Sequence, residues 1–556
     1  MARQIKHITI VGGGTAGWMT ASLLNTYLNP IGKPPRIKIS LIESPNIKTI
    51  GVGEATVPGM RRAVQAFGLD EREFIRRCNV TFKLGVDFVN WNHDENGNPV
   101  SYINPFNVGR TIRGFSPLYY FHKFGRQATD DTRAIDVIEA TTPTRDAITL
   151  KKGPRKVTHD NFFQQLPYAY HLDASLFSQY LAEVGLQRGV DYISDDVVNV
   201  SLDERGFVES LDLKERGKHP IEFVIDCTGF RGLIINQALG EPFVPYSKYL
   251  MNDRALAVQI PHKDPTDLLP CTRSTALGAG WVWRVPLQSR IGTGYVFSSA
   301  HRTDEEAQAE FLNHLGLTED EAQPRAIPIR VGRTRRAFVK NCLAIGLSSG
   351  FIEPLESTAI HMIEMASRYL FTYFPDMDFD ETLIASYNRA AEQLYDEVRD
   401  FIALHYVLNN RNDSDYWKAA REDMAVPDQL AENLKVWKYT LPSDYDFVTD
   451  KFFSKWNYQV ILFGKGYYPK DHVFPIAETL EEGDWKKYIH EFRAHKANLL
   501  AQLPGHHELI TALRNQSHKP TWAPQMAGTV PLPGGVSAPN DGPKMPAPVS
   551  DEGALL

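Results

Sequence analysis

A glycine-rich turn is the feature that most constrains how this chain folds. Gly12, Gly14 and Gly17 form the pattern G-x-G-x-x-G between an apolar run, residues 5–11, and a helical stretch, residues 16–27. Glycine lacks a β-carbon, so a phosphate group can approach the backbone amides at the positive end of the helix. The turn therefore predicts a dinucleotide site between a strand and a helix.

The next strand supports this interpretation. Residues 37–43 are mostly apolar and end in Glu43, where an acidic side chain would accept hydrogen bonds from the adenosine ribose. Together with Thr15 and Ala16 at the start of the helix, these residues predict the βαβ unit of a doubly wound, Rossmann-like α/β domain. The alternative is a tight turn followed by a solvated glutamate. The pattern does not separate NAD from FAD.

Three regions follow from the pattern of apolar residues along the 556-residue chain. Short β runs between residues 196 and 299 predict a mostly antiparallel β-sheet insertion, within a nucleotide-binding module at 1–375. Helical spacing predicts a mainly α-helical substrate-binding module at 376–518. Residues 519–556 are rich in proline and glycine, which predicts a flexible tail.

Composition limits the classes of partner and compartment. A net charge of -7 gives no basic surface for nucleic acid, and no apolar stretch approaches the roughly 18 residues that span a bilayer. The chain begins without a recognisable signal peptide, and its four cysteines are scattered, so we expect a cytoplasmic protein. Its histidines, including adjacent His506 and His507, lack ligand partners at suitable spacing, which predicts no metal site.

Several ordered segments resemble the flavin-dependent halogenases, of which the tryptophan halogenases are the best-known branch. Besides the glycine turn, the resemblance rests on segments that begin at Ile50, Phe88, Ile225, Gly280 and Glu353, with the sequences IGVGEATVP, FVNW, IDCTGFR, GWVWRVP and EPLEST. It covers about the first 470 residues. Residues 341–350 resemble the segment that holds the ribitol and flavin of FAD, which implies FAD as the cofactor and contacts from Gly346 and Leu347.

The resemblance implies a reaction in two places. Reduced FAD, FADH2, would react with O2 to a C4a-hydroperoxide, halide would attack its distal oxygen, and hypohalous acid would travel to an electron-rich aromatic substrate. Trp281 and Trp283 correspond to a tryptophan pair that would keep the substrate from the flavin. On their alternating spacing alone, both would be interpreted as core residues of a strand.

Two residues are implied as catalytic. Lys83 corresponds to a lysine whose ammonium could polarise hypohalous acid, or whose neutral amine could form a haloamine. Glu356 corresponds to a carboxylate that removes the ring proton. The local sequence also has simpler interpretations, because residues 81–88 alternate as a half-buried strand with Lys83 on its wet face, and Glu356 precedes a helix start.

A halide site is implied at the start of that helix. The backbone amides of Thr358 and Ala359 correspond to the family's halide-binding position, which an anion would favour at a helix N-terminus. Glycine is common at the second position, so Ala359 leaves the preference for chloride or bromide open.

The expected substrate pocket departs from the tryptophan branch. That branch often has His-Pro-Phe where this chain has Asn104, Pro105 and Phe106. It also has a tyrosine pair with a following acid, for which the best local match here is Asn457-Tyr458-Gln459, with Lys465 in place of the acid. A lysine cannot accept hydrogen bonds from a substrate ammonium. We therefore expect an indole-like substrate without the amino-acid group, enclosed by aromatic side chains that include Trp456, Tyr467 and Tyr468.

The resemblance also implies a separate NAD(P)H-dependent flavin reductase as the source of FADH2. The alternatives are an FAD-dependent monooxygenase that hydroxylates its aromatic substrate, and a flavin-binding protein without catalysis. The oligomeric state is open, with a homodimer as one option.

Overall fold

The fold is that of a computed structural model, which describes residues 4–30, 32–47, 53–94, 96–106, 110–125, 137–447 and 452–516. The expected tail at 519–556 and residues Ile50 to Val52 of one resemblance segment lie outside these ranges. The chain up to Pro520 forms one compact unit by its contacts. The division of that unit into modules at residue 375 stays a proposal.

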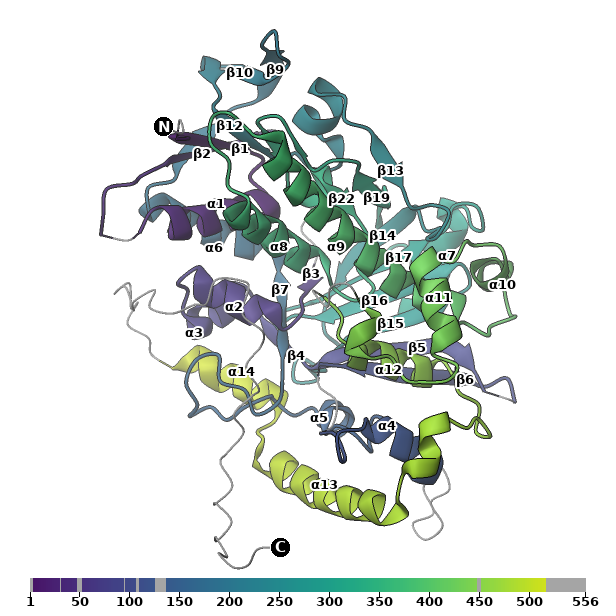
Figure 1. The fold of residues 1–556 in the computed structure, drawn as a ribbon. Helices are drawn as coiled ribbons and strands as arrows, with labels where there is room; N and C mark the ends of the chain where they lie inside the picture. Colours follow the sequence, from purple (N-terminus) through teal and green to yellow (C-terminus); the bar gives the residue numbers. More distant parts are fainter. Residues whose placement is uncertain are drawn as a thin grey trace, which may run out of the picture. The chain divides into compact units, whose positions relative to one another are not determined.

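A six-stranded sheet holds the N-terminal βαβ unit. Its order is β20 (Phe338–Val339), β21 (Cys342–Ala344), β12 (Phe223–Asp226), β1 (His7–Val11), β2 (Lys38–Glu43) and β8 (Asp191–Ser194), parallel except at β20. Helix α1 (Thr15–Leu28) connects β1 to β2, and α6 (Ala174–Gln187) and α8 (Ala359–Thr372) pack against it (Figure 1). This arrangement confirms the predicted doubly wound sheet.

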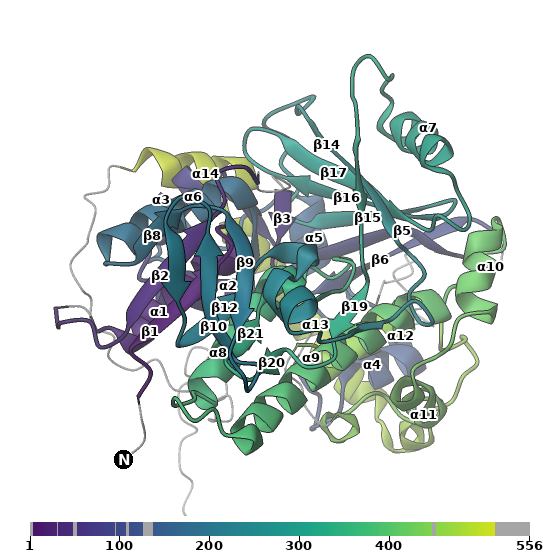
Figure 2. The same ribbon diagram turned by 90° about the horizontal axis from the view of Figure 1, so that it is seen from above.

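A second, seven-stranded sheet confirms the predicted antiparallel insertion, but only its strands between residues 254 and 297 come from the predicted range 196–299. In that range, β12 belongs instead to the parallel sheet, and residues 197–220 form a small sheet of their own. The order of the seven-stranded sheet is β18 (Arg325–Pro328), β14 (Arg254–Ile260), β17 (Ile291–Phe297), β16 (Gly280–Pro286), β15 (Thr272–Leu277), β5 (Gly85–His93) and β6 (Pro99–Pro105). Only the β5–β15 pair is parallel. Seen from above, the two large sheets are separate groups of strands (Figure 2). Three further sheets have three strands each. The first consists of β3 (Gly53–Ala55), β7 (Ala169–Asp173) and β4 (Thr81–Lys83), and the second of β11 (Gly217–Pro220), β10 (Val208–Leu213) and β9 (Val197–Leu202). The third consists of β13 (Phe243–Pro245), β19 (Gly332–Thr334) and β22 (Gly350–Phe351).

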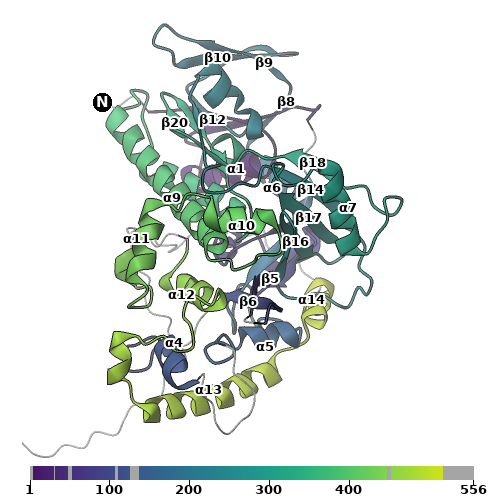
Figure 3. The same cartoon turned by 90° about the vertical axis from the view of Figure 1, so that its right-hand side faces the viewer.

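The C-terminal part is mainly α-helical, as the apolar spacing predicts. Its helices are α9 (Glu381–Val407), α10 (Asp415–Glu422), α11 (Asp428–Val436), α12 (Lys455–Gly464), α13 (Glu482–Gln502) and α14 (His506–Asn515). Earlier helices are α2 (Gly59–Ala66), α3 (Glu71–Arg77), α4 (Pro117–Tyr120), α5 (Thr144–Thr149) and α7 (Asp304–Leu315). Helix α13 runs along α4, with which it is in contact (Figure 3). In the described ranges, no helix is both long and apolar enough to cross a membrane.

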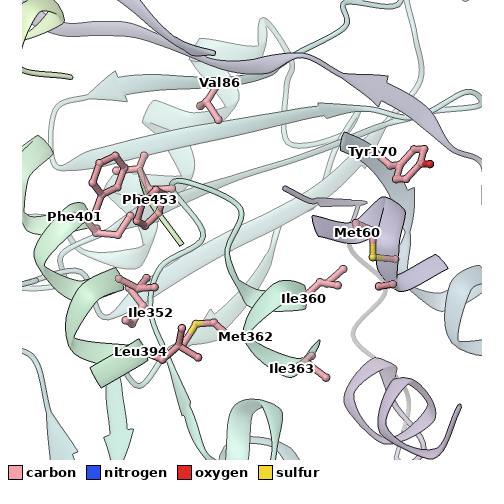
Figure 4. Packing of buried hydrophobic residues seen from close by; sticks show 14 of the residues in the cluster. Met60, Val86, Tyr170, Ile352, Ile360, Met362, Ile363, Leu394, Phe401 and Phe453 are labelled. Atoms are coloured by element: carbon pink, nitrogen blue, oxygen red, sulfur yellow. The ribbon is translucent and has the colours of Figure 1, made fainter. Parts of the chain in front are cut away.

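The main core lies between α8, α9 and the sheets. Ile360, Met362 and Ile363 project from α8, and Phe401 of α9 lies beside Phe453 (Figure 4), with a ring separation of 3.7 Å. Aromatic stacking and apolar burial of this kind stabilise the fold and hold α9 in place. The core therefore fixes the two helices that border the site described below.

The strand that carries Lys83 differs from its sequence-based interpretation. The alternation at 81–88 predicted one wet face, but β4 ends at Lys83, β5 begins at Gly85, and every residue from 81 to 88 is buried. At Lys83 the face expected to be wet is covered by Thr56, Phe106 and Ser357, which contact its Nζ from other parts of the sequence. The prediction of an exposed Lys83 from local pattern was wrong.

His506 fastens α14 to β4, and we expect this contact to make stability depend on pH. Its Nε2 accepts a hydrogen bond from the Phe82 backbone N–H (3.0 Å), and its Nδ1 donates to the Leu268 carbonyl (2.8 Å). Burial lowers the pKa of His506 from 6.5 to about 4. Between these values the unfolded chain binds more protons, so the free energy of unfolding should fall by up to about 3 kcal/mol as pH falls from 6.5 to 4.

Denaturant unfolding from pH 7.5 to 4 measures this dependence. The variant His506→Gln cannot titrate and should flatten the acid limb of the profile. An unchanged limb in the variant would assign the acid sensitivity to other groups.

Candidate active site

A cavity of about 460 Å³ begins at the glycine turn and extends to the start of α8. Its lining includes Gly14, Glu43, Trp283, Gly346 and Ala359. Gly12, Thr15, Ala16 and Leu347 also border it. The structure thus brings predicted cofactor residues to one cavity, although they come from distant parts of the chain.

The glycines fit a bound dinucleotide for distinct geometric reasons. Gly12 has φ +117°, and an added β-carbon would lie 2.3 Å from the Cys227 carbonyl oxygen. A β-carbon on Gly17 would lie 1.8 Å from the Gly12 oxygen, so Gly17 permits the helix to approach the turn. Gly14 has open space around its α-carbon and is the N-cap of α1, without a side-chain cap. The helix amides are therefore available to a pyrophosphate, as FAD requires.

Glu43 and Gly346 complete the cofactor end of the cavity. Glu43 is half-buried at the end of β2, where burial raises the pKa of its carboxyl. Gly346 has φ +77°, and a β-carbon there would lie 2.6 Å from the Ala16 β-carbon. Glycine at 346 therefore permits the 341–350 segment to lie against the glycine turn, and the residues present fit FAD.

We expect Gly14→Ala to separate cofactor binding from folding. The added methyl group meets no protein atom within 4 Å and therefore should leave the Tm nearly unchanged, yet it would occupy the space in front of the α1 amides. FAD affinity should fall at least about tenfold, which corresponds to about 1.4 kcal/mol. Fluorescence titration with FAD measures this change.

Gly483→Ala, at another open position, is the matched control and should bind FAD normally. Normal binding by Gly14→Ala would place the cofactor elsewhere.

Lys83 is completely buried at the end of β4. Its Nζ donates hydrogen bonds to the Thr56 carbonyl (2.9 Å) and to Ser357 Oγ (2.8 Å), and lies 5.3 Å from the centre of the Phe106 ring. Burial lowers the pKa of Lys83 to about 7, against the opposing influence of Glu356. Both protonation states of the amine are therefore accessible near neutral pH.

Glu356 lies next to Ser357 in the segment before α8, and it is also buried. Its Oε1 accepts a hydrogen bond from Asn104 Nδ2 (2.9 Å) and lies 3.2 Å from His405 Nε2. Burial lowers the pKa of His405, while Glu356 opposes this effect. The contact between Lys83 and Ser357 thus brings the two predicted catalytic residues to the same segment.

The start of α8 has the features of an anion site. Thr358 is the N-cap, but its side chain does not cap the helix. Its Oγ1 is buried and has no hydrogen-bond partner among the described residues. The first turn contains no acidic residue, so the helix N-terminus presents uncompensated positive charge to the cavity beside Ala359.

The two tryptophans occupy different positions. The Trp283 ring lines the cavity and lies over Gly294, where a β-carbon would be 2.1 Å from Trp283 Cη2. Trp281 is completely buried, its ring is inclined at 61° to that of Trp283 with the centroids 6.4 Å apart, and its Nε1 donates to Glu353 Oε2 (2.7 Å). Only Trp283 of this pair therefore faces the cavity, and Trp281 supports it from one side.

The predicted pocket residues lie in two layers. Asn104 contacts Glu356 directly, Phe106 lies beside Lys83, and Pro105 is buried at the end of β6. Tyr458 is farther away, packed against Phe401 at 4.8 Å. Tyr468 packs with His122, His472 and Phe474 in another cluster, and the hydroxyl of Tyr467 donates to Leu434.

The side chains of Gln459 and Lys465 form hydrogen bonds within the protein. Gln459 accepts a hydrogen bond from Ser116 (2.9 Å) and donates to the Pro442 carbonyl (2.6 Å). Lys465 is buried, and its Nζ donates to Asn92 Oδ1 (3.1 Å). Burial lowers the pKa of Lys465 well below its usual value. Neither side chain replaces the acid that would bind a substrate ammonium.

Three residues of this site, Ser357, Glu353 and His405, were given no role from the sequence, and the hydrogen bond between Asn457 and Asn104 was not predicted. Glu353 lies in a segment that the resemblance includes, but nothing in its spacing indicates a bond to Trp281. His405 was visible only as a histidine within a helical stretch. Among the described residues, no group of three metal-ligating side chains is found, and the four cysteines are free thiols.

Comparison with known proteins decides the family. The family model described as tryptophan halogenase matches residues 7–481. The chain belongs to the tryptophan halogenase family. It is 38% identical to the tryptophan 6-halogenase SttH of Streptomyces toxytricini over 84% of this chain and 90% of that protein. It is 36% identical to the 7-chloro-L-tryptophan 6-halogenase KtzR of Kutzneria sp. over 91% and 99% of the two chains.

Solved structures agree with this membership. A tryptophan halogenase from Shewanella frigidimarina superposes with a TM-score of 0.85 at 34% identity, over 92% of this chain and 98% of that one. BrvH, a flavin-dependent halogenase from Brevundimonas sp., superposes with a TM-score of 0.80 at 36% identity, over 92% and 99%. This member of the tryptophan halogenase family is an FADH2- and O2-dependent halogenase that uses chloride or bromide and acts on a small aromatic substrate.

Proposed function

We propose that this halogenase acts on an electron-rich, indole-like substrate that lacks an amino-acid group, through Lys83 and Glu356. The observation that carries the proposal is the burial of both residues around one segment, with Lys83 bonded to Ser357 and Phe106 beside it. An aromatic ring between Phe106 and Glu356 would lie within reach of an electrophile at Lys83 and a base at Glu356.

Lys83 activates the halogenating agent in this proposal. O2 is the oxidant, and reduced FAD, when bound, would supply the two electrons with which O2 and halide give hypohalous acid and water. The Lys83 amine already uses two hydrogen-bonding directions for Thr56 and Ser357, which leaves one N–H to donate to the oxygen of hypohalous acid. As the O–halogen bond breaks, the ammonium gives a proton to the departing hydroxide, which leaves as water.

The other site residues support the same reaction. The uncapped amides at Thr358 and Ala359 are suited to hold halide, and Thr358 Oγ1, which has no partner among the described residues, is an additional donor. Trp283, supported by Trp281, borders the cofactor cavity and would keep the aromatic substrate from it. We further propose that a separate flavin reductase supplies FADH2.

The substrate class follows from the polar groups around Tyr458. Two acids act on Tyr458 electrostatically, but both have partners: Glu397 accepts from the Phe452 and Phe453 amides (3.0 and 3.1 Å), and Asp400 pairs with Arg399 at 2.7 Å. A buried polar group that already has partners gains little from a new ligand. An amino-acid ammonium would therefore meet no free carboxylate among these described residues, whereas an indole needs none.

Product formation from indole and from free tryptophan tests the proposal. The protein is incubated with FAD, NADH, an unrelated flavin reductase and bromide, and halogenated products are measured by mass spectrometry. We expect a kcat/KM for indole at least about tenfold above that for tryptophan, and no product when the reductase is omitted. A preference for tryptophan would contradict the substrate class, and NADH-driven turnover without the reductase would contradict the proposed partner.

A further inference from the structure

A continuous series of hydrogen bonds between side chains leads from the start of α12 to one oxygen of Glu356. It begins at α12, where Asn457 Oδ1 accepts hydrogen bonds from Ser454 N and Oγ, both at 3.0 Å. Asn457 Nδ2 then donates to Asn104 Oδ1 (3.1 Å), and Asn104 Nδ2 donates to Glu356 Oε1 (2.9 Å). The cap of α12 is thereby linked to the carboxylate.

This series of hydrogen bonds fixes the orientation of the Asn104 amide. Because Asn457 must present its oxygen to the Ser454 backbone amide, its NH2 group faces Asn104. Asn104 must accept from that NH2 group with its own oxygen, so its NH2 group faces Glu356. The direction of every bond follows from the helix cap, and a rotated Asn104 amide would place two oxygens against each other at the carboxylate.

His405 of α9 meets the same carboxylate oxygen from another element. Its ring is stacked on Phe88 at 4.7 Å and packed against Phe401 at 5.4 Å, so its plane is held by aromatic contacts. Its Nδ1 pairs with the Tyr102 hydroxyl at 2.9 Å. When that hydroxyl donates, the remaining ring proton is on Nε2, which lies 3.2 Å from Glu356 Oε1.

The contact between His405 and Glu356 is less well aligned than its distance suggests. His405 Nε2 is buried and makes no hydrogen bond of good geometry to any described residue, although it lies within ion-pair distance of Oε1. We therefore assign the stronger hold on Oε1 to Asn104. His405 closes the other approach to this oxygen.

We propose that Asn104 is a positioning residue that, with His405, occupies Oε1 of Glu356 and leaves Oε2 as the single acceptor of the substrate proton. No described residue donates a hydrogen bond to Oε2. This inference rests on the proposed role of Glu356 as the base. It also changes the role of Asn104, which we predicted from sequence as a wall of the substrate pocket.

Glu356 accepts a proton in the second of two steps. A carbon–halogen bond forms as the O–halogen bond of hypohalous acid breaks, and the ring becomes a cation. The electron pair of the C–H bond at that carbon then returns to the ring, and its proton passes to Oε2. With Oε1 held, Oε2 has one position relative to the ring, which makes this second step fast.

The variant Asn457→Asp tests the inference because it preserves the helix cap and reverses the amide chain. The new carboxylate can still accept from Ser454, but its second oxygen would face Asn104 Oδ1, so the Asn104 amide should rotate and turn its oxygen toward Glu356. We expect kcat for indole bromination to fall at least about tenfold with KM changed less than about threefold. Indole deuterated at its ring carbons should show a primary isotope effect near 1 with the native protein and at least about 2 with the variant, because proton removal becomes rate-limiting.

Asn104→Leu removes the donor directly and should show the same isotope effect. Ser454→Ala is the matched control, because it weakens the same helix cap but leaves the Asn457–Asn104 bond in place; its isotope effect should stay near 1. Glu356→Gln separates this inference from the proposed function.

If Glu356→Gln retains full activity, the proposed base is wrong and the inference fails with it. If Glu356→Gln is inactive while Asn457→Asp and Asn104→Leu show native rates and no isotope effect, the positioning role alone is overturned. An isotope effect in Ser454→Ala as large as in Asn457→Asp would also overturn it, because a loosened helix would then suffice.

Discussion

Replacing Lys83 with methionine should abolish halogenation while FAD binding persists. Methionine has a similar length and fills the buried space without a charge, so the contact with Phe106 remains but the donor to hypohalous acid is lost. The loss of one preorganised donor in a buried site typically costs about 100- to 1000-fold in rate. We expect at least about a 100-fold fall in bromoindole formation, measured with FADH2 supplied in excess.

Lys465→Met is the matched control for this substitution. Lys465 is also buried, with a lowered pKa, but its Nζ donates to Asn92 and the Trp91 carbonyl. Its replacement should lower the Tm and leave the chemical step within a few-fold of the native rate. Equal losses of turnover in both variants would show that burial of any lysine in this region matters, and not the chemistry of Lys83.

The pH profile distinguishes the two chemical roles of Lys83. Because burial lowers its pKa to about 7, the ammonium fraction falls as pH rises through 7. If the ammonium activates hypohalous acid, as we propose, kcat/KM should fall about tenfold per pH unit above 7. A rate that instead rises through pH 7 would favour the neutral amine and a haloamine.

The sequence predicted the parts of the site that depend on local pattern. The glycine turn, Glu43 and the start of α8 are each defined by a strand or helix end, and such ends are visible in a single stretch of residues. The burial of Lys83 was not visible, because Thr56 and Ser357, which accept hydrogen bonds from its Nζ, are 27 and 274 residues away in sequence. Alternation of apolar and polar residues along one strand cannot predict which distant residues pack on its second face.

The hydrogen-bond partners of the buried polar residues were even harder to predict from the sequence. Asn104 and Glu356 are 252 residues apart, and Asn457 is 353 residues from Asn104. An asparagine at 104 is compatible with a pocket wall or with a hydrogen-bond chain, and only the tertiary contacts decide between them. Asn104 and Glu356 are in contact in the structure, and the direction of each bond between them and Asn457 depends on the helix cap at Ser454.

Glu353 should control both the stability of the protein and the barrier that Trp281 and Trp283 form between the substrate and the cofactor cavity. Its Oε2 accepts three hydrogen bonds, from Trp281 Nε1 (2.7 Å), Asn252 Nδ2 (2.8 Å) and the Tyr406 hydroxyl (2.7 Å). The residue is completely buried, and burial raises the pKa of its carboxyl. Glu353 therefore ties β16 to α9 through a polar cluster within the core.

Two substitutions at Glu353 should differ sharply. Glu353→Leu removes the acceptor of three buried donors, and Asn252 Nδ2 keeps a second acceptor in the Tyr406 hydroxyl (3.0 Å). At about 1–3 kcal/mol for each of the other two donors, we expect a loss of at least about 2 kcal/mol in the free energy of unfolding. Glu353→Gln can keep its amide oxygen in the accepting position and place its NH2 group at the site of Oε1, which has no partner among the described residues. Its stability should stay within about 1 kcal/mol of the native protein.

Loss of the hydrogen bonds to Glu353 should also weaken the barrier that Trp281 and Trp283 form. Without its bond to Glu353, Trp281 can move, and Trp283 loses the ring that supports it at 6.4 Å. In Glu353→Leu, assayed below its Tm, a larger share of reducing equivalents should end as hydrogen peroxide instead of halogenated product, whereas Glu353→Gln should keep the native ratio. If both variants keep that ratio, Trp283 holds its position without support from Trp281, and Trp283 alone forms the barrier.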